Sequence, residues 1–329
     1  MSYTSTNILS DGTCISKVKN LVELLGYIRY KDNTKIPNLI SSYFWYDYKN
    51  YMSFVGVELY IYKENGVITV ETRSRLGRSY WDLEQQNKTV KSLRGFLGGS
   101  FFTDEGKNRY MQNDKETPTK LESGLFISRW IYNNALVKPK LYLDLRNIQG
   151  EIAKPGLTGL EFIDQMNPRI FSNNLLIPFF VAAWENYLKS SYIVLLKCID
   201  NRDKALKNAR LTVDNLKDIS SGIMSIEEAI AEGLSFQRPR IAAENFKALD
   251  DKIDIYSVLK KPYKNRKISL FDSIEAIIDL RNEFVHTGSM DTDITNKKIK
   301  SIMSDFEVAV DRIYNRFGDY YKFIPNRDF

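Results

Sequence analysis

The chain has 329 residues, of which 43% are hydrophobic, which suggests two domains with ordinary cores. It has no apolar run of about 18 residues, and its first residues lack a signal-peptide pattern, so we expect a cytoplasmic protein that enters no membrane. The net charge of +6 permits contact with nucleic acid without requiring it, and Cys14 and Cys198 lack metal-ligand neighbours, so we expect no metal and no cofactor.

The first part of the chain mixes helix and strand patterns. A short helix is expected at 18–30, and the aromatic residues at 39–48 fit either a strand or a helix. Two β-rich runs at 54–62 and 67–72 flank an Asn-Gly dipeptide, which is typical of hairpin turns. These two runs therefore predict an antiparallel pair of strands.

The following residues continue this mixture of helix and strand. A helix is expected at 79–96, where two glycines end it, and turn residues interrupt the stretch 100–111. Apolar and aromatic runs at 125–132 and 140–145 fit further strands. The first half therefore predicts an α+β fold with at least one antiparallel sheet.

Prolines and glycines between 155 and 168 mark the passage to a helical second half. We therefore predict an α+β domain at 1–168, with a role in sensing, RNA recognition or regulation, and an all-α bundle at 169–329. Apolar residues at helical spacing predict the helices of this bundle. These helices are expected at 174–199, 202–219, 225–234, 241–249, 270–286 and 294–317.

The helix that ends near Gly288 carries the residues of greatest functional interest. At about 100° per residue its apolar side chains share one face. These side chains are Phe271, Ile274, Ile277, Ile278, Phe284 and Val285. Arg281 lies near the middle of that face, where an unpaired guanidinium would cost roughly several kcal/mol. We therefore expect Arg281 to pair in the core or to face a cleft or a partner chain.

His286 is the only histidine of the chain and follows Arg281 on the same helix. Asn282 precedes it by one helical turn, so the amide shares a face with the imidazole and can orient it. A lone histidine near a helix end is usually a capping or surface residue. The significance of His286 therefore depends on its surroundings.

The segment from Arg281 to His286 resembles the Arg-x4–6-His motif of HEPN-superfamily ribonucleases, including the polar residue that often follows the arginine. The segment from Ser235 to Asp254 resembles the corresponding part of the HEPN branch that includes RiboL-PSP-type proteins, and residues 181–188 resemble the first helix of that branch. The resemblance covers roughly residues 170 to 320. It implies that the second half is a HEPN-like helical ribonuclease domain.

Glu185 is a second charged residue on an apolar helix face, where it stands between Val181 and Leu188. Its charge is opposite to that of Arg281, so we expect the two side chains to approach each other and to offset the cost of burying both. A core ion pair without any chemistry would explain the same pattern.

Cleavage of RNA without a metal needs a group that accepts the 2′-hydroxyl proton, a group that protonates the leaving oxygen, and positive charge on the phosphate. Histidine suits both proton transfers because its pKa lies near neutrality, and the forked guanidinium of Arg281 suits the phosphate. One chain provides only His286, whereas two chains provide two imidazoles. The resemblance implies such a homodimer, with both motifs in one cleft, although one histidine could also act with water.

The resemblance further implies a toxin or an anti-phage abortive-infection effector that cleaves RNA, with a phage-derived trigger or an antitoxin protein as a partner. A different function also fits the sequence. The helical half would then be a non-catalytic, dimerising module that binds RNA or a nucleotide, and the first half would recognise a protein.

Charged residues of the first half give two weaker signals. Arg73, Arg75 and Arg78 stand near aromatic residues and are candidate RNA contacts, although an ordinary hairpin exit packed on a helix fits them equally. Glu71, with Glu58 nearby, is similar to the strand carboxylates of metal nucleases, but a solvated strand face explains it as well.

Overall fold

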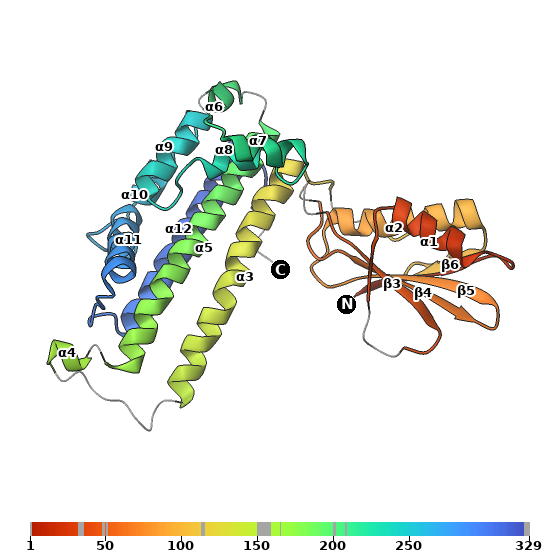
Figure 1. Cartoon of the computed structure of the whole chain (residues 1–329), viewed down its shortest axis with the longest axis horizontal. Coiled ribbons are helices and arrows are strands. Elements are labelled where there is room, and N and C mark those ends of the chain that lie inside the picture. The colour runs from red at the N-terminus through yellow and green to blue at the C-terminus, as the bar shows by residue number, and fades with distance from the viewer. Residues whose placement is uncertain are drawn as a thin grey trace. The chain divides into compact units, whose positions relative to one another are not determined.

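A computed structural model describes residues 2–31, 36–47, 50, 52–112, 116–149, 159–164, 166–199, 202–207 and 209–325. The chain divides into two compact units, Met1–Gly124 and Leu125–Arg327, and each is described by itself (Figure 1). This division lies earlier in the chain than the predicted limit at 168, because most of helix α3 (Lys120–Gln149) belongs to the second unit.

The N-terminal unit is built on one antiparallel sheet, as predicted. The strands follow the order β2-β3-β4-β5-β1-β6-β7, and each pairing is antiparallel. The β4–β5 hairpin turns at Asn65 and Gly66, both with positive φ, as a two-residue turn of this kind requires. The strands are β1 Tyr3–Ile8, β2 Ile28–Tyr30, β3 Leu39–Trp45, β4 Val57–Glu64, β5 Val67–Ser74, β6 Ser100–Thr103 and β7 Gly106–Lys107.

Helices α1 (Ile15–Leu24) and α2 (Tyr80–Leu97) lie on the same face of this sheet (Figure 1). Every second side chain of the central strands is buried, and Leu59 and Val70 pack in one core with Val18 and Leu93 of the helices. Neither helix packs on the opposite face of the sheet. The alternation of buried and exposed residues is the pattern that a sheet covered on one side requires.

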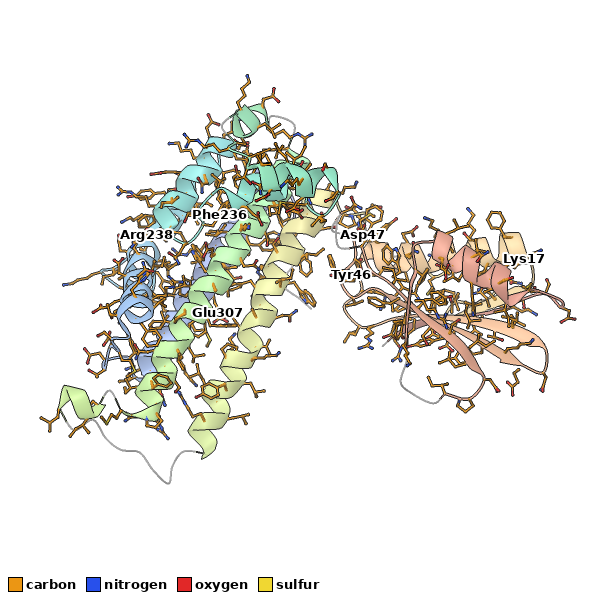
Figure 2. All side chains as sticks on the ribbon, viewed as in Figure 1. Lys17, Tyr46, Asp47, Phe236, Arg238 and Glu307 are labelled. Atoms are coloured by element: carbon orange, nitrogen blue, oxygen red, sulfur yellow. The ribbon has the colours of Figure 1, made fainter. Side chains whose placement is uncertain are left out.

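The C-terminal unit is helical, which confirms the predicted all-α region. The long helices α3, α5 (Pro168–Cys198) and α12 (Asn296–Tyr321) run side by side (Figure 1), and side chains cover them along their length (Figure 2). The ring of Tyr132 on α3 contacts Tyr187 on α5, and Trp184 on α5 contacts Phe306 on α12. The shorter helices are α4 Glu161–Asp164, α6 Asp203–Lys207, α7 Val213–Ser220, α8 Ile226–Glu232, α9 Pro239–Leu249, α10 Ile255–Lys260 and α11 Leu270–Thr287.

The strands predicted at 125–132 and 140–145 are wrong, because both runs lie inside α3. Tyr132, Leu136 and Leu143 are buried, and their spacing places them on one side of a helix. The aromatic and β-branched residues of these runs favour strands locally, but burial along one helical face overrides that preference.

Two predicted helices have different limits in the structure. The stretch 202–219 forms two short helices, because Thr212 caps a new helix, α7, with its side chain. The helix expected at 18–30 ends as α1 at Leu24, and Gly26 with φ +88° leads into strand β2. Helix α5 begins at Pro168, six residues before the predicted start, so Pro178 lies inside it. Helix α10 was not predicted, whereas α8, α9, α11 and α12 lie where helices were expected.

Candidate functional site

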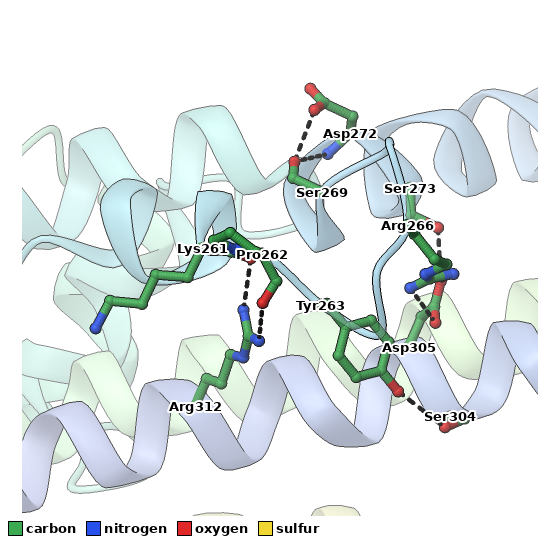
Figure 3. A network of polar contacts seen from close by, with 10 residues as sticks. All are labelled: Lys261, Pro262, Tyr263, Arg266, Ser269, Asp272, Ser273, Ser304, Asp305 and Arg312. Carbon is green, nitrogen blue, oxygen red and sulfur yellow. Dashed lines mark hydrogen bonds and ion pairs between the residues drawn. The ribbon is translucent and has the colours of Figure 1, made fainter.

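A buried ion pair fixes the first turns of α11, the helix with the Arg-x4–6-His segment. Arg266, in the connection before α11, donates two hydrogen bonds of 3.0 and 2.8 Å to the carboxylate of Asp305 in α12. Ser273 of α11 donates a third, of 2.7 Å, to the same carboxylate. These three bonds to the buried Asp305 join α11 and the connection before it to α12 (Figure 3).

The connection before α11 is also held on α12 by Arg312. Its guanidinium donates hydrogen bonds of 2.9 and 2.8 Å to the backbone oxygens of Lys261 and Pro262 (Figure 3). The ring of Tyr263 lies near two guanidinium groups, with its centroid 5.5 Å from Cζ of Arg312 and 4.6 Å from Cζ of Arg266. The start of α11 therefore has a fixed place in the bundle, and the position of its last turns follows from it.

The buried face of α11 is shorter than predicted. Its buried members are Phe271, Ile274, Ile277 and Ile278. Phe284 is half-buried, and Val285 is 48% exposed, so the prediction of a continuous apolar face is wrong for the last turns. Arg281 therefore lies at the open end of the face and not in its middle.

Arg281 is half-buried, and hydrogen bonds within the described chain satisfy its guanidinium only in part. Nη1 donates a hydrogen bond of 2.9 Å to Oδ1 of Asn282. Nε is buried and has no hydrogen-bond partner among the described residues. A buried N–H without an acceptor costs about 1–3 kcal/mol, so this atom can gain by donating to an oxyanion.

His286 occupies the last turn of α11 and is exposed. The helix ends at Gly288, as predicted, where φ is +72° and the N–H donates to the oxygen of Phe284 at 2.9 Å. The imidazole makes no hydrogen bond or ion pair with another described residue. The predicted contact with Asn282 is not formed, because the amide oxygen accepts a hydrogen bond from Arg281 instead.

Glu185 does not form the predicted ion pair with Arg281 in the described part of the chain. The residues that flank it on the α5 face, Val181 and Leu188, are buried as expected, whereas Glu185 is half-buried. Helices α5 and α11 do pack against each other. The partial exposure of Glu185 explains why it needs no ionic partner, since water can solvate its carboxylate.

Two buried asparagines of α5 hold the segment that follows α11, and the sequence analysis missed them. The side chain of Asn174 donates to the backbone oxygen of Asp291 at 3.0 Å and accepts from its N–H at 3.1 Å. Asn173 donates to the backbone oxygen of Ile294 at 2.6 Å. Adjacent asparagines in a long apolar helix are the sequence signal that would have identified them, because buried amides require partners.

An apolar strip on α5 is exposed on the surface of the C-terminal unit. Phe171, Leu175 and Phe179 are 48%, 48% and 41% exposed and follow one another by one helical turn. They lie opposite Trp184, whose ring contacts Phe306 of α12.

On α11, Asn282 and His286 lie on the side of the helix opposite Ser273, and Ser273 is the residue that bonds to α12. The apolar strip (Phe171, Leu175 and Phe179) and the imidazole therefore both face away from α12.

The three arginines proposed to contact RNA have different surroundings in the N-terminal unit. Arg73 is exposed on β5. Arg75 donates from Nε to the carboxylate of Glu58 at 3.0 Å, and this bond raises the pKa of its guanidinium. The guanidinium of Arg78 stacks 3.2 Å from the ring centroid of Tyr3, and burial lowers its pKa. Two of these three side chains thus have structural partners.

The strand carboxylates do not assemble a metal site in the described residues. Glu58 is buried and bonded to Arg75, and the burial of Glu71 raises the pKa of its carboxyl group. Within the described ranges, no cluster of three or more His, Cys, Asp or Glu side chains could hold a metal ion. The geometry therefore gives no support to a metal nuclease on this sheet.

Comparison with known protein families gives a match over most of the C-terminal unit. Residues 144–319 match the family model described as RiboL-PSP-HEPN, which confirms the resemblance and extends it into the end of α3. No curated protein and no solved structure matches the chain. Among the helices of the described part, none combines the length and the apolar character that crossing a bilayer requires.

Proposed function

Because the chain belongs to the RiboL-PSP-HEPN family, we propose that it is a metal-independent endoribonuclease. Domains of the HEPN superfamily are generally ribonucleases. The matched residues lie within the C-terminal unit and include the whole of α5, α11 and all but the end of α12. The proposal therefore assigns the chemistry to the Arg281–His286 segment of that unit.

The surroundings of Arg281 are the observation that carries this proposal. Its Nη1 is engaged by Asn282, which fixes the guanidinium, while the buried Nε has no acceptor among the described residues. A phosphate oxygen that displaces the atoms now covering Nε would supply the missing acceptor and would match the fork of the guanidinium. In this scheme Arg281 stabilises the charge on the phosphorane, and Asn282 positions Arg281.

His286 is proposed to transfer the protons. Its imidazole is exposed one and a half turns after Arg281, so a substrate strand can reach it from solvent. An imidazole can accept the 2′-hydroxyl proton or donate one to the leaving 5′-oxygen, because its pKa lies near the working pH. The expected products carry 2′,3′-cyclic phosphate ends.

A homodimer is proposed to complete the site, since one chain has one histidine and the reaction uses two proton-transfer groups. The apolar strip on α5 supports this step, because it offers a second copy an exposed apolar surface that, like His286, faces away from α12. Glu185 is proposed as a further carboxylate near this surface, with a role in orienting groups of the site.

The biological role that we propose is that of a toxin or an anti-phage abortive-infection effector in the cytoplasm. RNA would be the substrate, and a phage-derived trigger or an antitoxin protein would control the activity. The N-terminal unit would sense that trigger, select the RNA or restrain the nuclease, with Arg73, Arg75 and Arg78 as RNA contacts. This division of roles rests on the family and on the separate fold of the unit.

Incubation of the purified chain with total RNA, with and without EDTA, tests the proposal. We expect cleavage that EDTA does not inhibit and that His286→Ala and Arg281→Ala abolish. The matched control is Glu283→Ala, an exposed residue in the same turn of α11. Equal cleavage by wild type and His286→Ala would refute the scheme. A chain that binds RNA without cleaving it would favour the non-catalytic binding module.

A further inference from the structure

The sheet of the N-terminal unit has an open face, which we define as the side not covered by α1 and α2. Residues opposite each other in an antiparallel pair point to the same side, and the register places several rings there. The aromatic members of the open face are Tyr30, Phe44, Tyr60, Tyr62 and Phe102. None of these five rings is fully buried, whereas Tyr43 and Leu59 of the other side are.

The rings of Tyr30, Tyr60 and Tyr62 lie close to one another. The hydroxyl group of Tyr30 donates a hydrogen bond of 3.3 Å to that of Tyr60, and the ring centroids of Tyr60 and Tyr62 are 6.4 Å apart. Phe102 is 40% exposed and lies on β6, with β5 and β1 between it and the tyrosines of β4. The open face thus carries a group of tyrosines on β2 and β4 and a separate ring on β6.

Cationic side chains alternate with these rings. Arg73 follows Glu71 on the same side of β5, Arg75 continues that side beyond the strand, and Nζ of Lys107 lies 5.8 Å from the ring centroid of Phe102. Two acidic residues of the open face are less available, since Glu58 is buried and bonded to Arg75, and Glu71 is half-buried beside Arg73. Glu64, at the end of β4, is an exposed acidic residue of the same side. Arg73 and Lys107 are exposed cations next to the rings.

We propose that the open face binds single-stranded RNA, with bases stacked on Tyr30, Tyr60 and Phe102 and the backbone held by Arg73 and Lys107. Sheets that expose aromatic rings bind single strands in this way, because every base has a flat face that can stack. Cations beside the rings attract the phosphates. The identity of the ligand as RNA rests on the proposed function, whereas the surface itself rests on the register and the charges.

A protein partner fits this surface less well. The centre of a protein interface is usually depleted of charged residues, whereas here Arg73 and Glu71 stand in the middle of the sheet between the tyrosines of β4 and strand β1. Double-stranded RNA also fits less well, since its bases are already stacked and are not free to cover the rings. Single-stranded RNA uses both the rings and the cations.

The test measures binding of a fluorescent 2′-O-methyl oligonucleotide to the full chain, because this probe lacks the 2′-hydroxyl and cannot be cleaved by the proposed chemistry. We expect Phe102→Ala with Lys107→Gln to weaken binding by about tenfold or more. The matched control is Phe96→Ala with Lys91→Gln, which removes the same groups from exposed positions of α2. This control should bind as the wild type does.

The dependence of RNA affinity on salt concentration gives a second measure, and it uses a residue of the central strand β5 in place of Phe102 and Lys107. Arg73→Gln removes one cation from an exposed position, so it should lower the slope of log affinity against log salt by about 0.7 for a single strand. Circular dichroism of each variant checks the fold. The inference is overturned if the chain does not bind the probe, if the α2 control weakens binding equally, or if the variants of the open face bind as the wild type does.

The outcomes also separate this inference from the proposed function. Probe binding that depends on the open face, together with RNA cleavage that is absent or independent of His286, would keep the inference and reject the proposed nuclease. Cleavage that requires His286 while the open-face variants bind and cleave normally would do the reverse. Preferential binding of a duplex over the single strand would also overturn the inference.

Discussion

Replacing Arg266 with methionine tests whether the ion pair before α11 fixes the helix that carries the proposed site. The carboxylate of Asp305 has a side-chain exposure of 5% and accepts two bonds from Arg266 and one from Ser273. In Arg266→Met only the bond from Ser273 remains, and a buried charge has lost its partner. Breaking a fully buried pair costs about 3–5 kcal/mol.

The expected cost here is smaller, because the side chain of Arg266 is 32% exposed and water already screens part of the interaction. We therefore expect a loss of about 2–3 kcal/mol, measured as a lower urea midpoint in the helical circular dichroism. The matched control is Lys217→Met, because the pair Lys217–Asp214 has side-chain exposures of 71% and 87% and should change stability by less than about 0.5 kcal/mol.

A second variant separates the buried charge from the lost packing. Arg266→Met combined with Asp305→Leu removes both charges, so it should recover much of the stability lost by the single change. The reasoning is refuted if Arg266→Met unfolds at the same urea concentration as Lys217→Met. It is also refuted if the double variant is less stable than Arg266→Met, because the unpaired carboxylate would then not be the cause.

Further predictions concern the site and its supports. His286→Ala should lower the rate of RNA cleavage by about 10²-fold or more, measured by single-turnover kinetics, with an unchanged urea midpoint because the side chain is exposed. Leu175→Glu should give monomers in sedimentation velocity and reduce cleavage, because it places a charge in the apolar strip. Asn174→Ala should lower the free energy of unfolding by about 1–3 kcal/mol in a urea titration, because it leaves backbone groups after α11 without partners. Hydrogen bonds from Lys260 and Ser269 lower the pKa of Asp272 in the folded chain, so its stabilising effect is present above the unfolded pKa and is lost as the pH falls through the folded one. Asp272→Asn should therefore lose less stability than the wild type between neutral pH and about pH 3 in the same titration.

The sequence predicted correctly the turns and helices whose formation depends on a few neighbouring residues. The Asn-Gly hairpin formed because both turn residues adopt positive φ, and Gly288 ended α11 for the same steric reason. Hydrophobic spacing predicted α5 and α12 because a long helix must bury one side. The α+β and all-α halves follow from these elements.

The predictions were wrong where contacts between distant parts of the chain determine the secondary structure or the burial of a residue. The individual residues of α3 favour strands. In the structure, however, Tyr132 contacts Tyr187 of α5 and Arg129 donates to Asp311 of α12. Residues three apart share a side of a helix but not of a strand, so the two contacts require a helix. No local pattern encodes these partners. The periodicity of α11 likewise placed Arg281 near the middle of a continuous apolar face, because it could not show that the neighbouring helices leave the last turns of α11 uncovered.

The lone histidine on the last turn of α11 has a consequence for how the cleavage rate depends on the concentration of the chain. If two copies must meet before a strand is cut, the active species grows with the square of the chain concentration while most chains are monomers. Doubling the supply then raises the output about fourfold, and a low basal level does little harm. The rate of cleavage would then change more steeply with expression than it does for an enzyme that acts as a monomer.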